Sequence, residues 1–210
     1  MMSNLNLRPM TNPEIKYWYT EEFKKDFNLQ ERKPLSDIIG LRNSGHYDLL
    51  GLFSPIDKSH PEKMIGYATI WKSPNIELLL LDYLGVSSTL RNKGFGSQIL
   101  SFLKIYYKDQ YIVVESELPV PGDNPKENYI REHRINFYKR NRFEPVYEMA
   151  TCGMRWQALL FSTTSLDSSK ISQIMHDHKT LYGPSRTDVK IPLGLDETPD
   201  MPYWMLEKEY

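Results

Sequence analysis

The sequence has few of the features that would indicate a disulfide-rich, membrane-spanning or nucleic-acid-binding protein. Its 210 residues include one cysteine, Cys152, which excludes an intramolecular disulfide and favours a reducing compartment. The 26 Lys and Arg residues are balanced by 27 Asp and Glu residues, so the basic excess typical of nucleic-acid binding is absent. The most apolar run, residues 76–86, contains two acidic residues and is too short to cross a bilayer. We therefore expect a soluble, cytoplasmic protein without nucleic-acid or membrane partners.

The periodicity of apolar residues predicts alternating strands and helices. Helical spacing and capping residues predict helices over 12–27 (Asn12 as N-cap, Pro13 as first helical residue), 34–45, 94–107, 124–141 and 168–181. Apolar or alternating runs between turn residues predict strands over 5–7, 47–53, 63–71, 76–86 and 111–114, and a strand pair over 143–161 with its turn near Cys152. The strand–helix–strand order of 76–114 predicts a right-handed crossover with parallel pairing. The fold class is therefore α/β, with a mixed central sheet flanked by helices.

The segment between the apolar strand and the helix after it carries the strongest chemical signal. The first backbone N–H groups of a helix lack intrahelical partners, and the helix dipole favours anions at that end. Gly94 and Gly96 let a phosphate approach the backbone closely, and Arg91, Lys93 and the Ser97 hydroxyl add positive charge and a donor. A dinucleotide fingerprint would need a third glycine where Ile99 stands. The pattern predicts a pyrophosphate cradle, while a helix that merely begins with two glycines is the alternative on spacing alone.

The residues of this segment resemble a known family. Arg91-Asn92-Lys93-Gly94-Phe95-Gly96-Ser97, followed by Ile99-Leu100, is similar to the acetyl-CoA motif of the GCN5-related N-acetyltransferase (GNAT) superfamily. The segment 134–143, with its Phe137-Tyr138 pair, resembles the family's penultimate helix, and 79–86 resembles its central strand. The resemblance covers about residues 5–161. It implies a GNAT-like acyl-CoA N-acyltransferase fold with a splayed parallel strand pair over residues 1–165, followed by a C-terminal helix and a proline-containing tail over 166–210.

The resemblance also implies a division of roles among the site residues. Backbone groups of Leu84, Gly85 and Val86 would bind pantetheine and polarise the thioester, and amides from Asn92 to Ser97 would hold the pyrophosphate; the expected binding residues are Leu84, Gly85, Val86, Arg91, Asn92, Lys93, Gly94, Phe95, Gly96 and Ser97. Tyr138 matches the family's general acid by position, its alternative being a core tyrosine. Two departures are Arg131 at a position where many relatives carry asparagine, and Arg142 in place of a glycine, so that Asn141 is expected to take the left-handed turn conformation.

A general base is needed because an alkyl amine is mostly protonated near neutral pH and must lose a proton before it attacks. Asp82 shares a strand face with Leu84, and Glu115 and Glu117 share a face at the end of the next strand. We take Asp82 and Glu117 as the main candidates, with Glu115 as a third. The alternatives are a structural salt bridge from Asp82 to Arg131 or Arg134, and a solvated strand end for the two glutamates.

Three other signals predict structure, not chemistry. His176-Asp177-His178 lacks partners at metal-ligand spacing and is expected on a solvated helix face, so no metal is predicted. Cys152 is expected as a plain turn or buried cysteine. The aromatic group of Tyr17, Trp18, Tyr19 and Phe23 is expected to be mostly core.

Together these observations predict an N-acetyltransferase that transfers the acetyl group of acetyl-CoA directly to a primary amine in a ternary complex. The acceptor, whether a small amine, a peptide or a protein amine, carries no motif in the sequence. The alternative is a non-catalytic acyl-CoA-binding or regulatory module on the same fold. The tail after residue 183 is expected to be flexible or wrapped, and it is a candidate surface for a homodimer.

Overall fold

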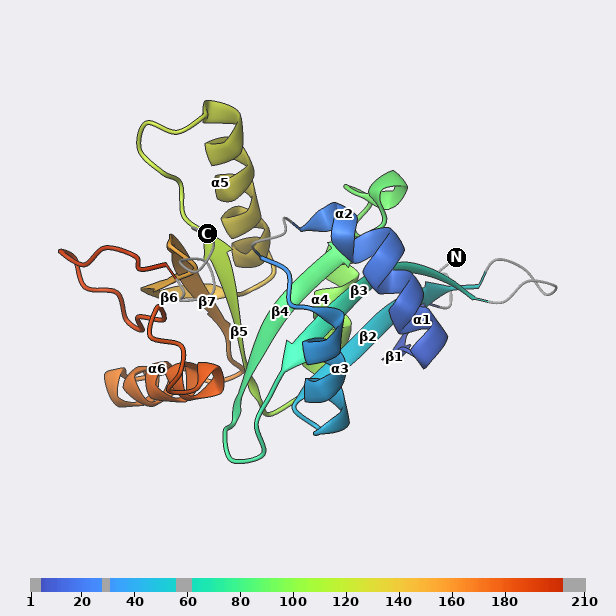
Figure 1. Cartoon of the computed structure of the whole chain (residues 1–210), viewed down its shortest axis with the longest axis horizontal. Coiled ribbons are helices and arrows are strands. Elements are labelled where there is room, and N and C mark those ends of the chain that lie inside the picture. The colour runs from blue at the N-terminus through green and yellow to red at the C-terminus, as the bar shows by residue number, and fades with distance from the viewer. Residues whose placement is uncertain (1–4, 28–30, 56–61, 202–210) are drawn as a thin grey trace, which may run out of the picture. The chain divides into compact units, whose positions relative to one another are not determined.

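The computed structural model describes residues 5–27, 31–55 and 62–201 (Figure 1). The strands are β1 (Asn6–Pro9), β2 (Tyr47–Ser54), β3 (Lys63–Trp71), β4 (Leu78–Val86), β5 (Tyr111–Glu117), β6 (Glu144–Thr151) and β7 (Met154–Phe161). The helices are α1 (Asn12–Tyr17), α2 (Lys24–Asp26), α3 (Leu35–Asn43), α4 (Phe95–Tyr106), α5 (Pro125–Arg140) and α6 (Ser168–Tyr182), with a π-helix η1 (Trp18–Phe23) and a 3₁₀ turn η2 (Ser88–Leu90). None of the helices in the described ranges has the length and apolarity needed to span a membrane.

The strands follow the order β1-β2-β3-β4-β5-β7-β6, with β4 and β5 as the parallel pair of a mixed sheet. The parallel pairing joins the two strands that flank α4, as the strand–helix–strand order predicts. Leu78–Leu81 of β4 are almost fully buried, because a strand inside a sheet covered on both faces has no solvated side. The mixed α/β class expected from the sequence is confirmed.

The chain forms two compact units, and β4 contributes to both. Unit 1 comprises Met1–Lys72 and Leu81–Lys108, and unit 2 comprises Ser73–Leu80 and Asp109–Tyr210. Leu78–Leu80 thus belong to the unit that contains β5, where the N–H of Tyr111 donates to the carbonyl of Glu77 at 3.2 Å. The rest of β4 belongs with β3, where the N–H of Ser87 donates to the carbonyl of Ile65 at 3.0 Å.

The core of unit 1 is aromatic. Trp18 and Phe23 of η1 are fully buried and pack with ring centroids 4.8 Å apart. Tyr67 of β3 lies 5.5 Å from Trp18, and Tyr83 of β4 lies 4.7 Å from Phe23, both edge to face. The expectation that this aromatic group is mostly core is confirmed, since only Tyr17 of it is exposed at the surface. These contacts hold α1, η1 and α3 on one face of β2–β4, and α4 covers the other (Figure 1).

The start of α1 differs from the sequence prediction by one residue. Thr11 and not Asn12 is the N-cap, and Pro13 is the second helical residue. The reason is the Glu14 carboxylate, which accepts hydrogen bonds from the N–H and hydroxyl of Thr11 at 2.7 and 2.9 Å. This capping box fixes the register of the first turn.

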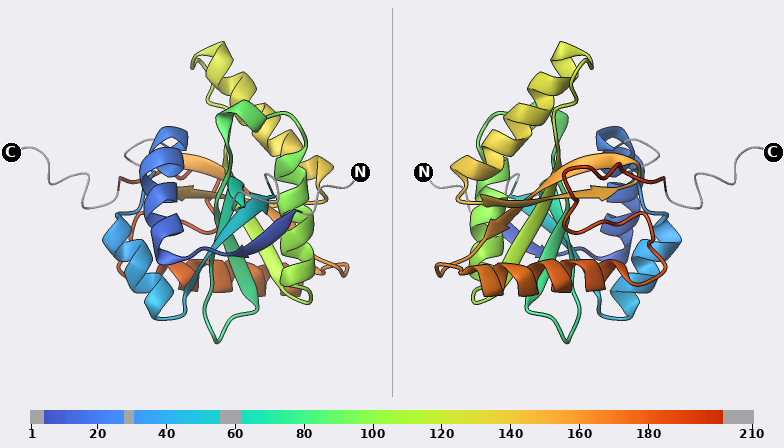
Figure 2. Two further views of the ribbon diagram at one scale, coloured as in Figure 1. Left: turned by 90° about the vertical axis from the view of Figure 1, so that its right-hand side faces the viewer. Right: turned by 90° about the vertical axis from the view of Figure 1, so that its left-hand side faces the viewer.

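Unit 2 contains the antiparallel strands β5, β7 and β6, the helices α5 and α6, and the segment after α6. That segment runs back along β6 (Figure 2): Lys190 pairs with Ala150, and the N–H of Leu193 donates to the carbonyl of Glu148 at 2.8 Å. Val189, Ile191 and Leu193 are buried. Of the two expectations for the tail, wrapping is therefore correct for residues 183–201, while the aromatic cluster at 203–205 lies outside the described residues.

Two local expectations in unit 2 were wrong. His178 is fully buried and not on a solvated face, because α6 packs this side against β5 and β6. At the end of α5, Arg142 and not Asn141 takes the left-handed conformation, with φ of 64° against −94°. Asn141 instead ends the helix, where its N–H donates to Tyr138 and Phe137 carbonyls and its side-chain amide donates to the Phe137 carbonyl.

Candidate functional site

The loop from β4 to α4 presents unpaired backbone amides. Gly94 is the N-cap of α4 and has a φ of 85°, and Asn92 also has a positive φ of 62°. The first intrahelical bond runs from Gln98 N to Gly94 O, so the amides of Phe95, Gly96 and Ser97 have no intrahelical acceptor. Left-handed residues that alternate with ordinary ones turn successive N–H groups towards one concavity, a geometry that binds anions.

Space and charge at this loop suit an anionic ligand. A Cβ built on Gly94 would meet no heavy atom within 4 Å, so the approach to the amides is open. Lys93 is exposed beside it, while Phe95, Gly96 and Ser97 are half-buried. The loop has the composition that the sequence predicted for a cradle, and the backbone conformation that such a cradle requires.

Arg91 is held by the Asp26 carboxylate and by the last residue of β4. Its guanidinium forms an ion pair with Asp26, and its Nε donates to the Val86 carbonyl at 3.3 Å. The Tyr67 hydroxyl donates to the other oxygen of Asp26 at 2.8 Å, and burial together with the Asp26 charge raises the pKa of Tyr67 well above its usual value. Arg91 is thus positioned at the base of the loop by Asp26, a carboxylate that no sequence motif singles out.

Gly85 has a packing role that the sequence did not reveal. A Cβ at this position would lie 2.2 to 2.4 Å from ring atoms of Tyr67, which is an impossible contact. The missing side chain makes room for the ring that holds Asp26. Leu84 and Val86 on either side are half-buried.

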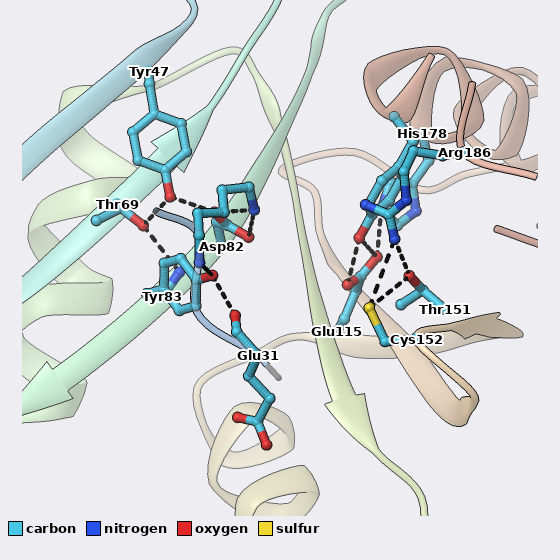
Figure 3. A network of polar contacts seen from close by, with 12 residues as sticks. Glu31, Tyr47, Thr69, Asp82, Tyr83, Glu115, Thr151, Cys152, His178 and Arg186 are labelled. Atoms are coloured by element: carbon cyan, nitrogen blue, oxygen red, sulfur yellow. Dashed lines mark hydrogen bonds and ion pairs between the residues drawn. The ribbon is translucent and has the colours of Figure 1, made fainter. Parts of the chain in front are cut away.

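Asp82, the first candidate base, receives three hydrogen bonds from two side chains. Lys33 Nζ donates to its two carboxylate oxygens at 2.9 and 2.7 Å, and the Tyr47 hydroxyl donates a short bond to Oδ2. The Tyr47 oxygen also lies 2.9 Å from the Thr69 hydroxyl, which accepts from the N–H of Tyr83 at 3.1 Å (Figure 3). The salt bridge considered for Asp82 exists, but its partner is Lys33 and not Arg131 or Arg134.

Glu117, the second candidate base, is paired with a guanidinium. Arg131 Nη2 lies 2.7 Å from Glu117 Oε1, and Arg131 Nη1 lies 2.6 Å from Asp123. The hydrogen bond to Glu117 is the largest cause that raises the pKa of Arg131. Arg131, which departs from the family pattern, therefore anchors the end of β5 to α5 and to the loop before it.

Glu115 lies in a separate buried network of unit 2. The Tyr182 hydroxyl contacts both of its oxygens at 2.8 Å, and His178 Nε2 lies 3.0 Å from Oε1. The other ring nitrogen of His178 lies 2.9 Å from the Tyr147 hydroxyl. No hydrogen bond accompanies this His178–Glu115 contact. Neither glutamate is a solvated strand end.

Tyr138, the expected acid, is nearly buried on α5. Its ring packs against Phe137 and Phe143, with centroids 5.1 and 5.7 Å away. Burial raises the pKa of Tyr138 to about 12, although the charge of Arg134 acts to lower it. The phenol therefore keeps its proton across the neutral range.

Cys152 and the described histidines are not part of a metal-binding cluster. Cys152 lies at the β6–β7 turn with a φ of 53°, as expected for a turn cysteine, and its Sγ is 3.7 Å from Arg186 Nη2 (Figure 3). Among the residues that the structure describes, no group of three or more His, Cys, Asp or Glu side chains is placed to hold a metal ion.

Comparison with solved structures identifies the fold. A protein described as a GNAT-family acetyltransferase from Bacteroides thetaiotaomicron superposes with a TM-score of 0.60 at 20% identity, over 85% of this chain and 98% of that one. The Escherichia coli ribosomal-protein-S18-alanine N-acetyltransferase gives 0.52 at 13%, over 78% and 97%. An aminoglycoside 6'-N-acetyltransferase solved with coenzyme A gives 0.53 at 10%, over 78% and 99%. No family model and no curated protein matches the sequence. The chain has the GNAT fold.

Proposed function

We propose that this protein is an acetyl-CoA-dependent N-acetyltransferase that transfers the acetyl group directly to a primary amine. The observation that carries the proposal is the concave group of backbone N–H groups at the start of α4, which we call the nest. Positive φ angles at Asn92 and Gly94 and unpaired amides at residues 95–97 follow a buried β4 strand. The GNAT fold and a neighbour solved with coenzyme A support the same ligand class.

The loop fits a diphosphate on physical grounds. The helix dipole and the free N–H groups of residues 95–97 both favour negative charge at the start of α4. Lys93, which is exposed and precedes Gly94 in the sequence, adds a formal positive charge to the loop. Arg91, already paired with Asp26, contributes less net charge and instead fixes the base of the loop.

Asp82 is the preferred base among the three carboxylates. It is the one whose carboxylate holds an alkylammonium, that of Lys33, which is the chemical group an acceptor amine would present. Glu117 is paired with Arg131 and Glu115 with Tyr182 and His178, so each serves a structural network of unit 2.

The proposed reaction is one displacement at the acetyl carbonyl. Asp82 takes a proton from the acceptor ammonium, and the neutral nitrogen forms a bond to the carbonyl carbon. Backbone N–H groups of the Leu84–Val86 stretch stabilise the oxyanion, as the family resemblance implies. The carbon–sulfur bond then breaks, and the thiolate takes a proton from Tyr138, whose role here rests on its match to the family motif. The nitrogen then loses its second proton, which restores the Tyr138 phenol. The products are the amide and coenzyme A.

Binding and turnover test the proposal separately. We expect calorimetry to show coenzyme A binding that Gly94→Val weakens about tenfold or more, because a branched residue resists φ of 85° and displaces the nest. Gly45→Val is the matched control: Gly45 has a φ of 80° and equally open surroundings, at the end of α3. Equal effects of the two variants would contradict the cradle.

Turnover is measured as coenzyme A release with primary amines, peptides and aminoglycosides. Coenzyme A release by the native protein that falls strongly in Asp82→Asn would support the proposed acetyltransferase activity. Binding of acetyl-CoA without release of coenzyme A for any acceptor would reject the enzyme in favour of a non-catalytic acyl-CoA-binding module. A cytoplasmic location and a homodimer formed through the tail remain predictions from the sequence.

A further inference from the structure

The ammonium of Lys33 lies in a cage within unit 1. Its Nζ donates to both oxygens of Asp82, at 2.9 and 2.7 Å. The same atom lies 4.8 Å from the centroid of Trp71 and 5.3 Å from that of Tyr83, at distances where ring faces attract cations. One carboxylate and two aromatic rings therefore surround the end of a four-carbon chain.

Asp82 is also held in this cage by a side chain other than Lys33. Tyr47 also donates to Oδ2, and the Tyr47 hydroxyl is hydrogen-bonded to the Thr69 hydroxyl. Tyr47 and Thr69 are fully buried, and burial together with the Asp82 charge raises the pKa of Tyr47 well above its usual value. The phenol thus remains a donor, and the carboxylate keeps its place when its cation leaves.

The main chain at Lys33 is also held independently of its side chain. The Tyr19 hydroxyl donates to the Lys33 carbonyl at 3.1 Å, and the Lys33 N–H donates to the Tyr83 hydroxyl at 3.2 Å. Tyr83 donates to the Glu31 carbonyl at 2.5 Å (Figure 3). The flexible methylene chain of Lys33 is therefore the movable part, and its side chain is 23% exposed against 11% for Asp82.

We propose that the cage of Asp82, Trp71 and Tyr83 is a binding site for a primary alkylammonium, and that Lys33 is its internal ligand, which competes with the acceptor. The assignment of the acceptor to this cage rests on the proposed function. Two N–H donors are needed to reach both Asp82 oxygens, so the site selects primary amines over quaternary ones. The narrow methylene stem of Lys33 is the template for its ligand, an unbranched aliphatic amine.

The cage is tested first without any acetyl transfer. Lys33→Ala leaves Asp82 unpaired, and we expect its melting temperature to fall. We expect n-butylammonium to raise the melting temperature of Lys33→Ala but not of the native protein, because it refills the vacated cage. Neutral n-butanol and tetramethylammonium at equal ionic strength are the ligand controls, and Lys33→Ala/Asp82→Asn is the protein control. Equal effects of the three additives, or equal rescue of the double variant, would overturn the cage.

Competition with the acceptor is tested by kinetics. While Lys33 occupies the cage, the acceptor cannot bind, so the apparent affinity for the acceptor falls in proportion to the fraction of molecules with a free cage. Lys33→Ala should therefore lower the KM for n-butylamine about threefold to tenfold. Lys33→Arg, which keeps a cation against Asp82, should not. An unchanged KM in Lys33→Ala would reject the cage as the acceptor site. If the protein acetylates no amine at all, the proposed function fails, while the melting experiment still decides whether the cage binds alkylammonium.

Discussion

Burial decides what the Tyr138 hydroxyl can contribute to a reaction. The side chain is 6% exposed, and burial raises its pKa to about 12 against the opposing charge of Arg134. An acid must be protonated to act, and this phenol loses its proton only as the pH approaches 12. Tyr138 therefore holds its proton at neutral pH and is available as a donor, and it suits no role that requires a phenolate in the resting protein.

We expect Tyr138→Phe to lower kcat about a hundredfold, since a positioned acid contributes on that order, with coenzyme A affinity unchanged. In the native protein, the rate should show no fall due to Tyr138 between about pH 7 and pH 10, because the acid form persists there. Tyr129→Phe on the same helix is the control, since Tyr129 is 67% exposed. Steady-state assays across this pH range measure the kcat of the variants and the pH dependence of the native rate. A kcat of Tyr138→Phe equal to that of the native protein would exclude Tyr138 as the acid.

At the scale of one element, the start of α1 shows how an ion pair and a cap reinforce each other. Arg8 on β1 donates to both oxygens of Glu14, at 3.0 and 2.8 Å. The Arg8 hydrogen bonds, aided by those from Thr11, lower the pKa of Glu14 from 4.5 to about 2, although burial opposes the shift. One carboxylate thus caps a helix and ties it to the edge strand of the sheet.

We expect Glu14→Gln to lower the free energy of unfolding at pH 7 by about 1 to 2 kcal/mol, the range of a lost cap and a partly screened ion pair. The folded pKa lies below the unfolded one, so the stabilisation is complete above about pH 4.5 and is lost as the pH falls towards 2. The difference between native protein and variant should therefore shrink on acidification through that window. Urea unfolding measures it. Glu21→Gln, in an exposed pair with Lys25, should change little at any pH.

The elements themselves were largely predictable from local pattern. Every strand and helix expected over the described residues is present, because apolar period and capping chemistry are local properties. The errors lie at single residues: Thr11 caps α1 through Glu14, and Arg142 takes the left-handed turn in place of Asn141. Both depend on which side-chain hydrogen bonds form, and the spacing of residues in the sequence does not decide between the possible bonds.

At the scale of the whole molecule, the buried carboxylate of Asp188 attaches the segment after α6 to the rest of unit 2. Asp188 is nearly fully buried and accepts from Arg186 Nε and Nη2 at 2.8 and 2.9 Å, and from the Cys152 N–H at 3.0 Å. Burial acts to raise the pKa of Asp188, but these hydrogen bonds outweigh it and lower the pKa. The bonds attach residues 186–188 to the β6–β7 turn.

We expect Asp188→Asn to reduce the free energy of unfolding by about 2 to 4 kcal/mol, because it leaves a part-buried guanidinium without its charge partner. Asp196→Asn, the same change at an exposed position of the same segment, should cost far less. Thermal unfolding compares the two. A similar loss in both variants would mean that the segment is not held by Asp188.

The sequence alone determined the element order, the mixed α/β class and the candidate cradle at residues 91–97, because each depends on residues close together along the chain. It also selected Asp82, but not what Asp82 contacts. The tertiary structure brought Lys33 to it across 49 positions, Tyr47 across 35, and Asp26 to Arg91 across 65. Such partners are chosen by packing between distant segments, and no local period or spacing encodes them.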